Sequence, residues 1–229
     1  MLTEYKSGSV NKFKSLNVDT GLRDEMFFKA SGSSNPTRLF VAGVHGDEEA
    51  ITRPIFEMMT KDIKITSGRL IVVSLSRDCP YISTLNEAYY DSTNGKKLLE
   101  LIQEYRPGIY VELHTYKRDN HSNLIDPDRR KKIGIPPFTE LEEEVLIGSV
   151  SPFIRTSKFR REDFCFTLEI PDPYSEKALQ IALHILRSIT LSSTRGEIIE
   201  KLREQYPRQI QEAEKNFREF KDMRNIFFF

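Results

Sequence analysis

RLFVAGVHG at residues 38–46 is followed directly by DEEAITRPIFEMMTK at residues 47–61. The apolar run from Leu39 to Val44 predicts a short buried β-strand that ends at a glycine turn. The second segment predicts a helix, because acidic residues in a first helical turn interact favourably with the helix dipole. Pro54 lies inside this helix and is expected to weaken or kink it. A buried strand leading into a helix is the first half of a strand–helix–strand unit.

The same alternation continues along the chain. Two further apolar runs predict buried strands, and an amphipathic segment between them predicts a helix. These are RLIVVSLS at 69–76, GIYVELH at 108–114 and, between them, GKKLLELIQEYR at 95–106. Strands that alternate with helices indicate an α/β fold, a mainly parallel (mixed) sheet flanked by helices and joined by right-handed crossovers.

The segments around this core differ in composition. Residues 1–37 are polar, with a loop-like SGSSNPT at their end. Residues 117–140 are rich in Pro, Asp, Asn and basic side chains, and a long segment of this kind inside a domain is usually functional or mobile. EVLIGSV at 144–150 and DFCFTLEIP at 163–171 predict two more strands.

The C-terminal part predicts helices. SEKALQIALHILRSIT at 175–190 is amphipathic, and we expect His184 to pack on its apolar face. The highly charged segment at 194–224 predicts a long solvated helix interrupted by Pro207. The terminal NIFFF is expected to pack onto the domain or onto a second subunit. We therefore expect one domain over residues 1–229, with a core at about 38–171 and a helical segment at about 174–222.

Composition narrows the class of protein. The 229 residues carry 34 basic and 34 acidic side chains, so no net charge favours nucleic acid or an anionic membrane as a partner. Cys79 and Cys165 lack metal-binding or disulfide spacing, and Cys165 is expected in the core. The N-terminus has no apolar signal region, and no apolar run reaches the roughly 20 residues of a membrane span. We expect a soluble cytoplasmic protein, with homo-oligomers left open.

HGDE at 45–48 follows the first predicted strand. Imidazole nitrogen and carboxylate oxygen are good zinc ligands at about 2.0–2.2 Å. The three-residue spacing lets His45 and Glu48 converge if the chain turns after the strand, and Gly46 would permit that turn. This pattern often occurs by chance, and in the alternative His45 caps a turn and Glu48 opens a helix.

Two later strands carry matching groups. His114 ends the predicted strand at 108–114, and carboxyl ends of parallel strands share one edge of a sheet. His45, Glu48 and His114 would form the two-histidine, one-carboxylate set of catalytic zinc sites, with a fourth position open for water. Glu169 lies in an apolar strand, where burial is costly unless the carboxylate has a role. It would act as a general base on the zinc-bound water, or else face solvent at the strand end.

These residues, in this order, resemble the zinc carboxypeptidase superfamily and are most similar to its succinylglutamate desuccinylase and aspartoacylase branch. ELHTY at 112–116 is similar to the family's histidine motif, and the resemblance covers about residues 38–171. In its short length the chain is also similar to the proteins of an uncharacterised archaeal group with this site. The resemblance implies one Zn²⁺ per chain, held by His45, Glu48 and His114, with Glu169 as base. It implies hydrolysis of an amide bond in a small N-acyl amino acid or a peptide that carries a carboxylate.

The chain departs from the family where substrate is bound. The family's Asn-Arg pair, which binds the substrate carboxylate and polarises the scissile carbonyl, is missing. Its place is taken by a short segment in which Arg77, Asn94 and Lys96 are candidates. Arg118 is a further candidate, because a guanidinium matches a carboxylate bidentately, and Tyr116 could hydrogen-bond a tetrahedral intermediate. The alternative for each basic residue is an exposed surface charge, and for Tyr116 a structural role.

Three interpretations follow. In the first the protein is a zinc-dependent amide hydrolase. In the second the fold and metal site persist without catalysis, and the protein binds a ligand or serves in an assembly. In the third the histidines are structural and elemental analysis finds no metal. His121, seven residues after His114, is expected to be a loop histidine without a role.

Overall fold

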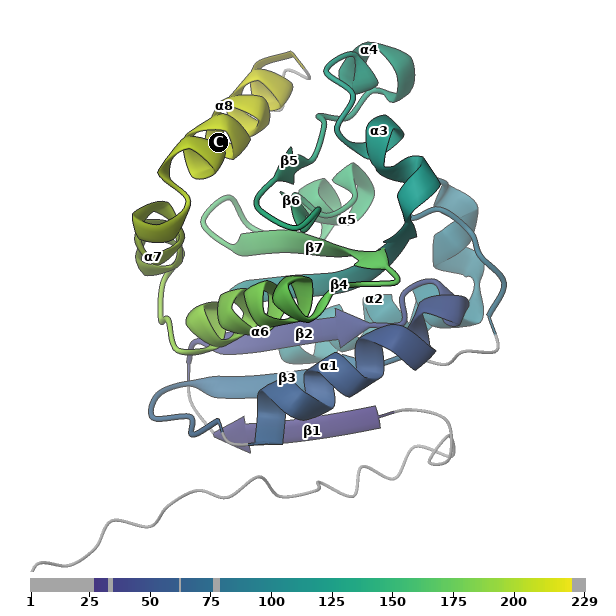
Figure 1. The fold of residues 1–229 in the computed structure, drawn as a ribbon. Helices are drawn as coiled ribbons and strands as arrows, with labels where there is room; N and C mark the ends of the chain where they lie inside the picture. Colours follow the sequence, from purple (N-terminus) through teal and green to yellow (C-terminus); the bar gives the residue numbers. More distant parts are fainter. Residues whose placement is uncertain (1–26, 33–34, 62, 76–78, 224–229) are drawn as a thin grey trace, which may run out of the picture.

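The structure, a computed structural model, describes residues 27–32, 35–61, 63–75 and 79–223. A seven-stranded sheet runs through it in the order β1-β3-β2-β4-β7-β6-β5 (Figure 1). Its strands are β1 (Phe27–Gly32), β2 (Thr37–Ala42), β3 (Arg69–Ser74), β4 (Ile109–Lys117), β5 (Thr139–Glu140), β6 (Leu146–Gly148) and β7 (Phe164–Asp172). The four central strands, β3, β2, β4 and β7, are parallel, and β1, β6 and β5 add to the two edges antiparallel. The predicted α/β fold with a mainly parallel sheet is therefore confirmed.

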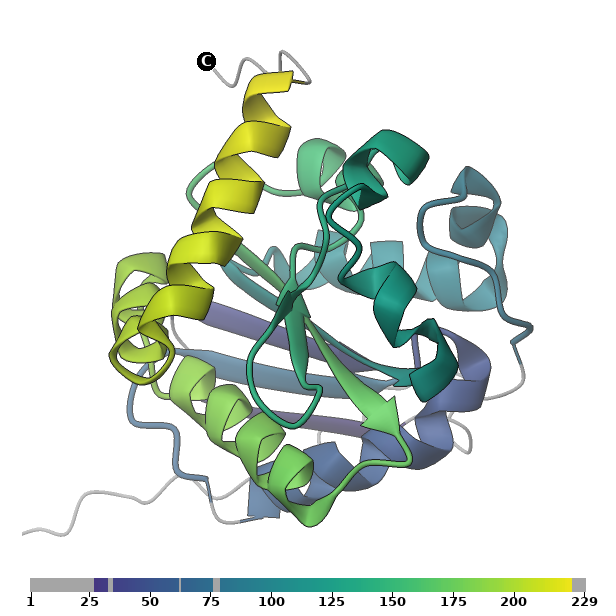
Figure 2. The same cartoon turned by 45° about the horizontal axis from the view of Figure 1, so that its top comes forward.

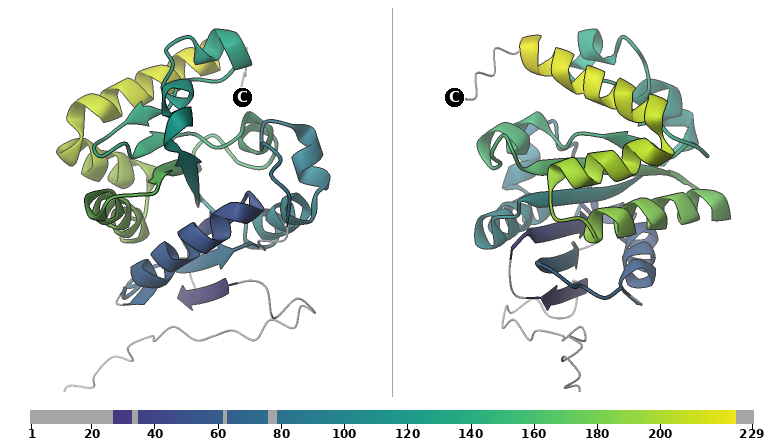
Figure 3. Two further views of the ribbon diagram at one scale, coloured as in Figure 1. Left: turned by 45° about the vertical axis from the view of Figure 1, so that its right-hand side comes forward. Right: turned by 90° about the vertical axis from the view of Figure 1, so that its left-hand side faces the viewer.

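Helices cover both faces of the sheet. Their bounds, with short 3-10 turns as η, are η1 (Gly46–Glu48), α1 (Glu49–Lys61), η2 (Glu87–Asp91), α2 (Thr93–Tyr105), η3 (Arg118–Asn120), α3 (His121–Leu124), α4 (Arg129–Ile133), α5 (Pro152–Ser157), α6 (Glu176–Thr190), α7 (Arg195–Gln205) and α8 (Pro207–Met223). Helices α1 and α6 pack on one face, and α2 packs on the other (Figure 3). None of the described helices is long and apolar enough to cross a membrane.

Strand alternation separates the two cores. Val111 of β4 belongs to the core under α1 and α6, whereas Tyr110 belongs to the core under α2. Because side chains alternate between the faces of a sheet, Tyr110, Glu112 and His114 form one row on the α2 face. All three side chains are buried. The candidate functional groups of β4 thus lie on the α2 face of the sheet.

The end of the sheet near β5 is enclosed by segments from far apart in the sequence. Helix α8 rises on one side of β5, β6 and β7, and α3 and α4 lie on the other (Figure 2). Helices α7 and α8 divide at Pro207, as the sequence predicts, because proline cannot continue the backbone hydrogen bonding. Pro54, in contrast, is accommodated within α1.

Several expectations need correction. The polar N-terminal segment contributes β1, which pairs with β3 and runs into the expected loop at 31–37. Short helices occupy part of residues 117–140. His184 is exposed rather than packed, and its Nε2 atom contacts Gln205 Nε2 at 2.7 Å across to α7. The expectations for the N-terminal MLTEYKSGSVNKFK and for NIFFF lie outside the described residues.

Candidate metal centre

The backbone after β2 makes a tight exit from the sheet. Gly43 has φ of +64°, and a Cβ there would lie 2.9 Å from the Leu75 carbonyl oxygen, so glycine is required. The glycine that supplies this conformation is Gly43 rather than Gly46, which opens η1. The Asn94 side-chain amide donates to the Gly43 carbonyl at 3.1 Å, and the Tyr89 hydroxyl donates to the Val44 carbonyl at 3.1 Å. These bonds fix the peptide that carries His45.

The exit places His45 and Glu48 against His114. All three side chains are buried, and they offer ligand atoms that lie within 4.8 Å of one another. His114 Nδ1 is 3.2 Å from Glu48 Oε2, and the two imidazole ring centres are 5.2 Å apart. His45 Nδ1 is buried without a hydrogen-bond partner. An unpaired buried ring nitrogen is costly, and a metal ion would satisfy it. The donor set therefore fits a divalent metal ion.

The buried carboxylate of Glu112 orients His114 through the ring nitrogen that does not face Glu48. Glu112 Oε2 lies 3.2 Å from His114 Nε2, and the Tyr110 hydroxyl donates to Glu112 Oε1 at 2.7 Å. Metal-binding histidines typically donate their other ring N–H to such a carboxylate, which fixes the tautomer and the ring orientation. Nδ1 of His114 is thereby left for a metal ion on the side of Glu48.

The charges of the cluster also favour a cation. Burial lowers the pKa of His45, and the neighbouring His114 lowers it further, so this imidazole is neutral and able to ligate. Burial also lowers the pKa of His114, but the carboxylates of Glu48, Glu112 and Glu169 outweigh it, and the pKa lies well above its ordinary value. The surroundings of His114 are thus strongly negative. A bound metal ion would replace its proton as the compensating charge.

Glu169 stands beside His114 in the sheet. The two residues are direct partners in the β4–β7 register, and both line the same cavity. Burial raises the pKa of Glu169 to about 7, with His114 acting against the shift. β4 continues three residues beyond His114, so His114 lies within the strand rather than at its predicted end, whereas Glu169 lies near the end of β7, as predicted. A carboxyl that titrates near neutral pH can exchange a proton with water.

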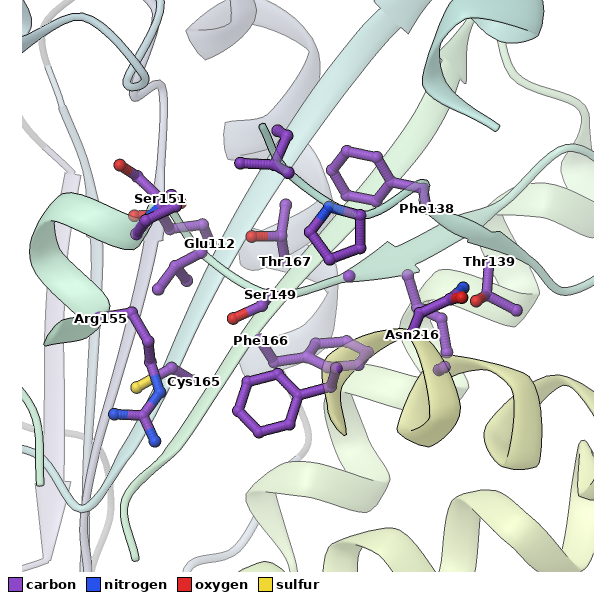
Figure 4. Close-up of a pocket in the computed structure, with 18 of the residues that line it drawn as sticks. Glu112, Phe138, Thr139, Ser149, Ser151, Arg155, Cys165, Phe166, Thr167 and Asn216 are labelled. Atoms are coloured by element: carbon purple, nitrogen blue, oxygen red, sulfur yellow. The ribbon is translucent and has the colours of Figure 1, made fainter. Parts of the chain in front are cut away.

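A cavity of about 520 Å³ includes His45 and His114 of the cluster in its lining. Figure 4 shows other lining residues, from Glu112 and Ser151 to Asn216 of α8. His45, His114 and Glu169 line one end, together with Tyr81, whose ring centre lies 4.6 Å from that of His45. Concave sites of this size that combine apolar walls with a few polar groups are typical of ligand pockets. Cys165, predicted in the core, is partly buried, packs against the core under α2 and also lines this cavity.

The predicted substrate-binding residues lie elsewhere. The Asn94 side chain donates to the Gly43 carbonyl where the chain leaves β2, and Lys96 is exposed on α2. The Tyr116 hydroxyl donates to the Glu144 carbonyl at 2.5 Å, and Arg118 pairs with the Glu144 carboxylate. None of these four lines the cavity described here, and Arg77 lies outside the described residues.

His121 begins α3 rather than lying in a loop. Its Nε2 is 3.2 Å from a carboxylate oxygen of Glu140, and its ring stacks on Tyr116. His121 does not line the cavity either.

Arg129 is one of several arginines that line the cavity, and the sequence analysis did not single it out. The side chain is 9% exposed, and its Nη1 donates to the Pro136 carbonyl at 2.9 Å. Its guanidinium lies over the Phe138 ring, 4.9 Å from the centroid. Burial lowers the pKa of Arg129, and the nearby Glu169 opposes that shift. The one available signal was its position in the segment 117–140, which the composition marked as functional or mobile.

Comparisons with known proteins define the family. Residues 33–222 match the model of a family described as "Uncharacterized protein conserved in archaea (DUF2119)". The chain is also 39% identical over 190 residues to "Uncharacterized protein MJ0501" of Methanocaldococcus jannaschii, an alignment that covers 82% of this chain and 91% of the relative. The chain therefore belongs to the DUF2119 family of archaeal proteins.

Proposed function

We propose that the protein is a zinc-dependent hydrolase that cleaves an amide bond in a small N-acyl amino acid or a peptide bearing a carboxylate. The observation that carries this proposal is the buried triad of His45, Glu48 and His114 at one end of a cavity that Glu169 also lines. Two histidines and one carboxylate are the protein ligands of many catalytic zinc sites. The resemblance to zinc carboxypeptidases supports zinc over other divalent ions.

The side chains divide the chemistry. When bound, zinc would supply a nucleophile from water at neutral pH and polarise the scissile carbonyl. Glu169, whose pKa in the metal-free protein is about 7, would accept the proton that the water loses and deliver it to the amine nitrogen as the C–N bond breaks. The water oxygen would join the acyl carbon and its second proton would also pass to the amine, so the products are a carboxylate and an ammonium group. Glu112 holds His114 in the ligating orientation throughout.

Arg129 is proposed to bind the substrate carboxylate. Arg129 and Arg155 are both buried at the cavity wall, and Arg129 is the one whose charge acts on Glu169. Its one hydrogen bond to the described residues uses Nη1, which leaves the other guanidinium nitrogens for a ligand. A guanidinium binds a carboxylate through two parallel hydrogen bonds, which would fix the substrate beside the metal.

Metal content and turnover test the proposal together. We expect about one zinc per chain by elemental analysis after zinc loading, and turnover with a panel of N-acyl amino acids and short peptides. His45→Ala and His114→Ala should lose the zinc, whereas His184→Ala, which removes an exposed histidine on α6, should keep it. Glu169→Gln should keep the zinc and lose turnover at least about 100-fold.

Zinc content and turnover also distinguish the hydrolase from the alternatives. Full zinc retention in either His45→Ala or His114→Ala would overturn the site. Zinc binding without turnover of any substrate would favour the second candidate, a ligand-binding or assembly protein on the same fold. That candidate is favoured by one observation: none of the described residues predicted from the sequence to bind substrate lines the cavity.

A further inference from the structure

The edge of β7 is only partly covered. β6 pairs with β7 over Thr167–Glu169 and goes no further, whereas β4 pairs with the other side of β7 along its whole length. Phe164–Phe166 precede Thr167 in β7. None of the described strands pairs with them on the β6 side. This stretch of edge borders the cavity, because all three of its residues line it.

The backbone of Cys165 faces that uncovered side. The Phe164 N–H donates to the Gly108 carbonyl at 2.9 Å, toward β4. Because successive residues of a strand point their N–H and C=O groups to opposite sides, those of Cys165 point away from β4. No described residue forms a hydrogen bond with them. A donor and an acceptor spaced for strand pairing are therefore available at the cavity wall.

The cavity is long along this strand. Glu169 lines it at one end and Phe164 at the other. The five residue steps at about 3.3 Å each give a length of about 16 Å, of which β6 covers the edge at Thr167–Glu169 and leaves about 7 Å free at Phe164–Phe166. A small N-acyl amino acid would occupy the metal end alone, so the remainder has room for several further residues of an extended chain.

The cavity wall near α8 offers both apolar surface and a polar group. Asn216 of α8 lines the cavity, and its Nδ2 atom is buried without a hydrogen-bond partner (Figure 4). The apolar surface around it comes from β7, α7, α8 and the segment before β5, namely Phe138, Phe166, Leu202, Ile210, Ala213 and Phe217. An occupant must therefore place apolar side chains here and also an oxygen near Asn216.

We infer that the substrate is an extended peptide that adds as a short strand to the free edge of β7 at Cys165, with its carboxyl end toward the metal cluster. This inference rests on the proposed function and names the substrate class of that site. Peptide strands bind sheet edges through main-chain hydrogen bonds, and pockets for alternate side chains give specificity. A long alkyl chain would fill the same apolar space but leave the Cys165 backbone and Asn216 unpaired, which is costly.

Binding to a non-hydrolysing variant tests this inference without relying on turnover. Zinc-loaded Glu169→Gln protein is titrated with N-terminally fluorescein-labelled Ala/Leu/Phe peptides of two, four and six residues with a free carboxyl end, and anisotropy is followed. We expect affinity to rise at least about tenfold from two to six residues. N-methylation at successive amides of the hexapeptide should weaken binding about tenfold or more at the position that pairs with Cys165.

Matched controls separate pairing from general apolar affinity. Asn216→Leu should weaken the hexapeptide at least about fivefold, while Asn123→Leu, on α3 outside the cavity, should not. N-dodecanoyl-leucine is the competitor without a peptide backbone, and we expect it to displace the hexapeptide poorly. Affinity independent of length and of N-methylation, or strong displacement by N-dodecanoyl-leucine, would overturn strand addition.

The two proposals can fail separately. Turnover of N-acyl amino acids by the zinc-loaded wild-type protein without peptide binding would leave the hydrolase standing and overturn the peptide inference. Length-dependent peptide binding without turnover of any substrate would support the peptide inference and overturn the hydrolase.

Discussion

Replacing Glu169 by Gln in the metal-free protein should increase stability, and the increase should grow with pH. The folded protein holds the Glu169 pKa at about 7, against an ordinary value of 4.5, because burial disfavours the carboxylate. A carboxyl whose pKa is raised by folding contributes its full stability below the unfolded pKa and loses it as pH rises through the folded pKa. Since each pKa unit is worth about 1.4 kcal/mol, the loss amounts to roughly 3 kcal/mol by pH 8. Gln has nearly the same shape and cannot ionise, so the variant avoids this loss.

Urea denaturation of chelator-treated protein measures the effect. The free energy of unfolding of Glu169→Gln and wild type should agree near pH 4.5 and diverge toward roughly 3 kcal/mol at pH 8. Glu162→Gln, at an exposed position before β7, serves as the control and should follow wild type at every pH. A difference between Glu169→Gln and wild type that is constant from pH 4.5 to 8 would refute the reasoning, because the raised pKa would then have no energetic consequence.

Three further predictions concern the residues around the site. Glu112→Gln should lower zinc affinity by about 10- to 100-fold in competition with a chelator, because His114 loses the charged partner that orients it; unchanged affinity would remove Glu112 from the site. Gly43→Ala should lower the free energy of unfolding by about 1–3 kcal/mol in urea, since a Cβ at φ of +64° meets the Leu75 carbonyl; a neutral result would show that the β2 exit can relax. Because burial raises the pKa of the Cys165 thiol, iodoacetamide should modify it about tenfold or more slowly than glutathione at pH 8, followed by mass spectrometry; equal rates would show that the thiol is solvated.

The parallel core could be predicted because its strands are buried on both faces. Continuous apolar runs such as LFVAGV at 39–44 and RLIVVS at 69–74 mark such strands with little ambiguity. The edge strand β1 carries no such run, since FFKASG joins an apolar pair to polar and small residues. Its assignment depends on pairing with β3, a contact more than 30 residues away that no local pattern encodes.

The candidate metal ligands were accessible to sequence reasoning for a similar reason. His45 and His114 follow or end apolar runs, so strand geometry alone brings them to one region of a parallel sheet. The substrate-binding candidates were not accessible in this way. Arg118 pairs with Glu144 from the distant β5–β6 turn, and only the fold reveals that pair. Arg129 is one of four consecutive basic residues, and the register of the short helix α4 decides which of them turns inward.

The two ends of the cavity are encoded in separate parts of the gene. The triad and Glu169 come from residues 45–169, whereas much of the wall around Asn216 comes from α7 and α8, the last described helices. Changes in those helices would alter which ligand the cavity accepts while leaving the metal ligands untouched. A single ancestral metal centre could thus acquire different preferences through C-terminal variation alone. Exchange of α7 and α8 between members of this archaeal family is accordingly a direct route to altered selectivity.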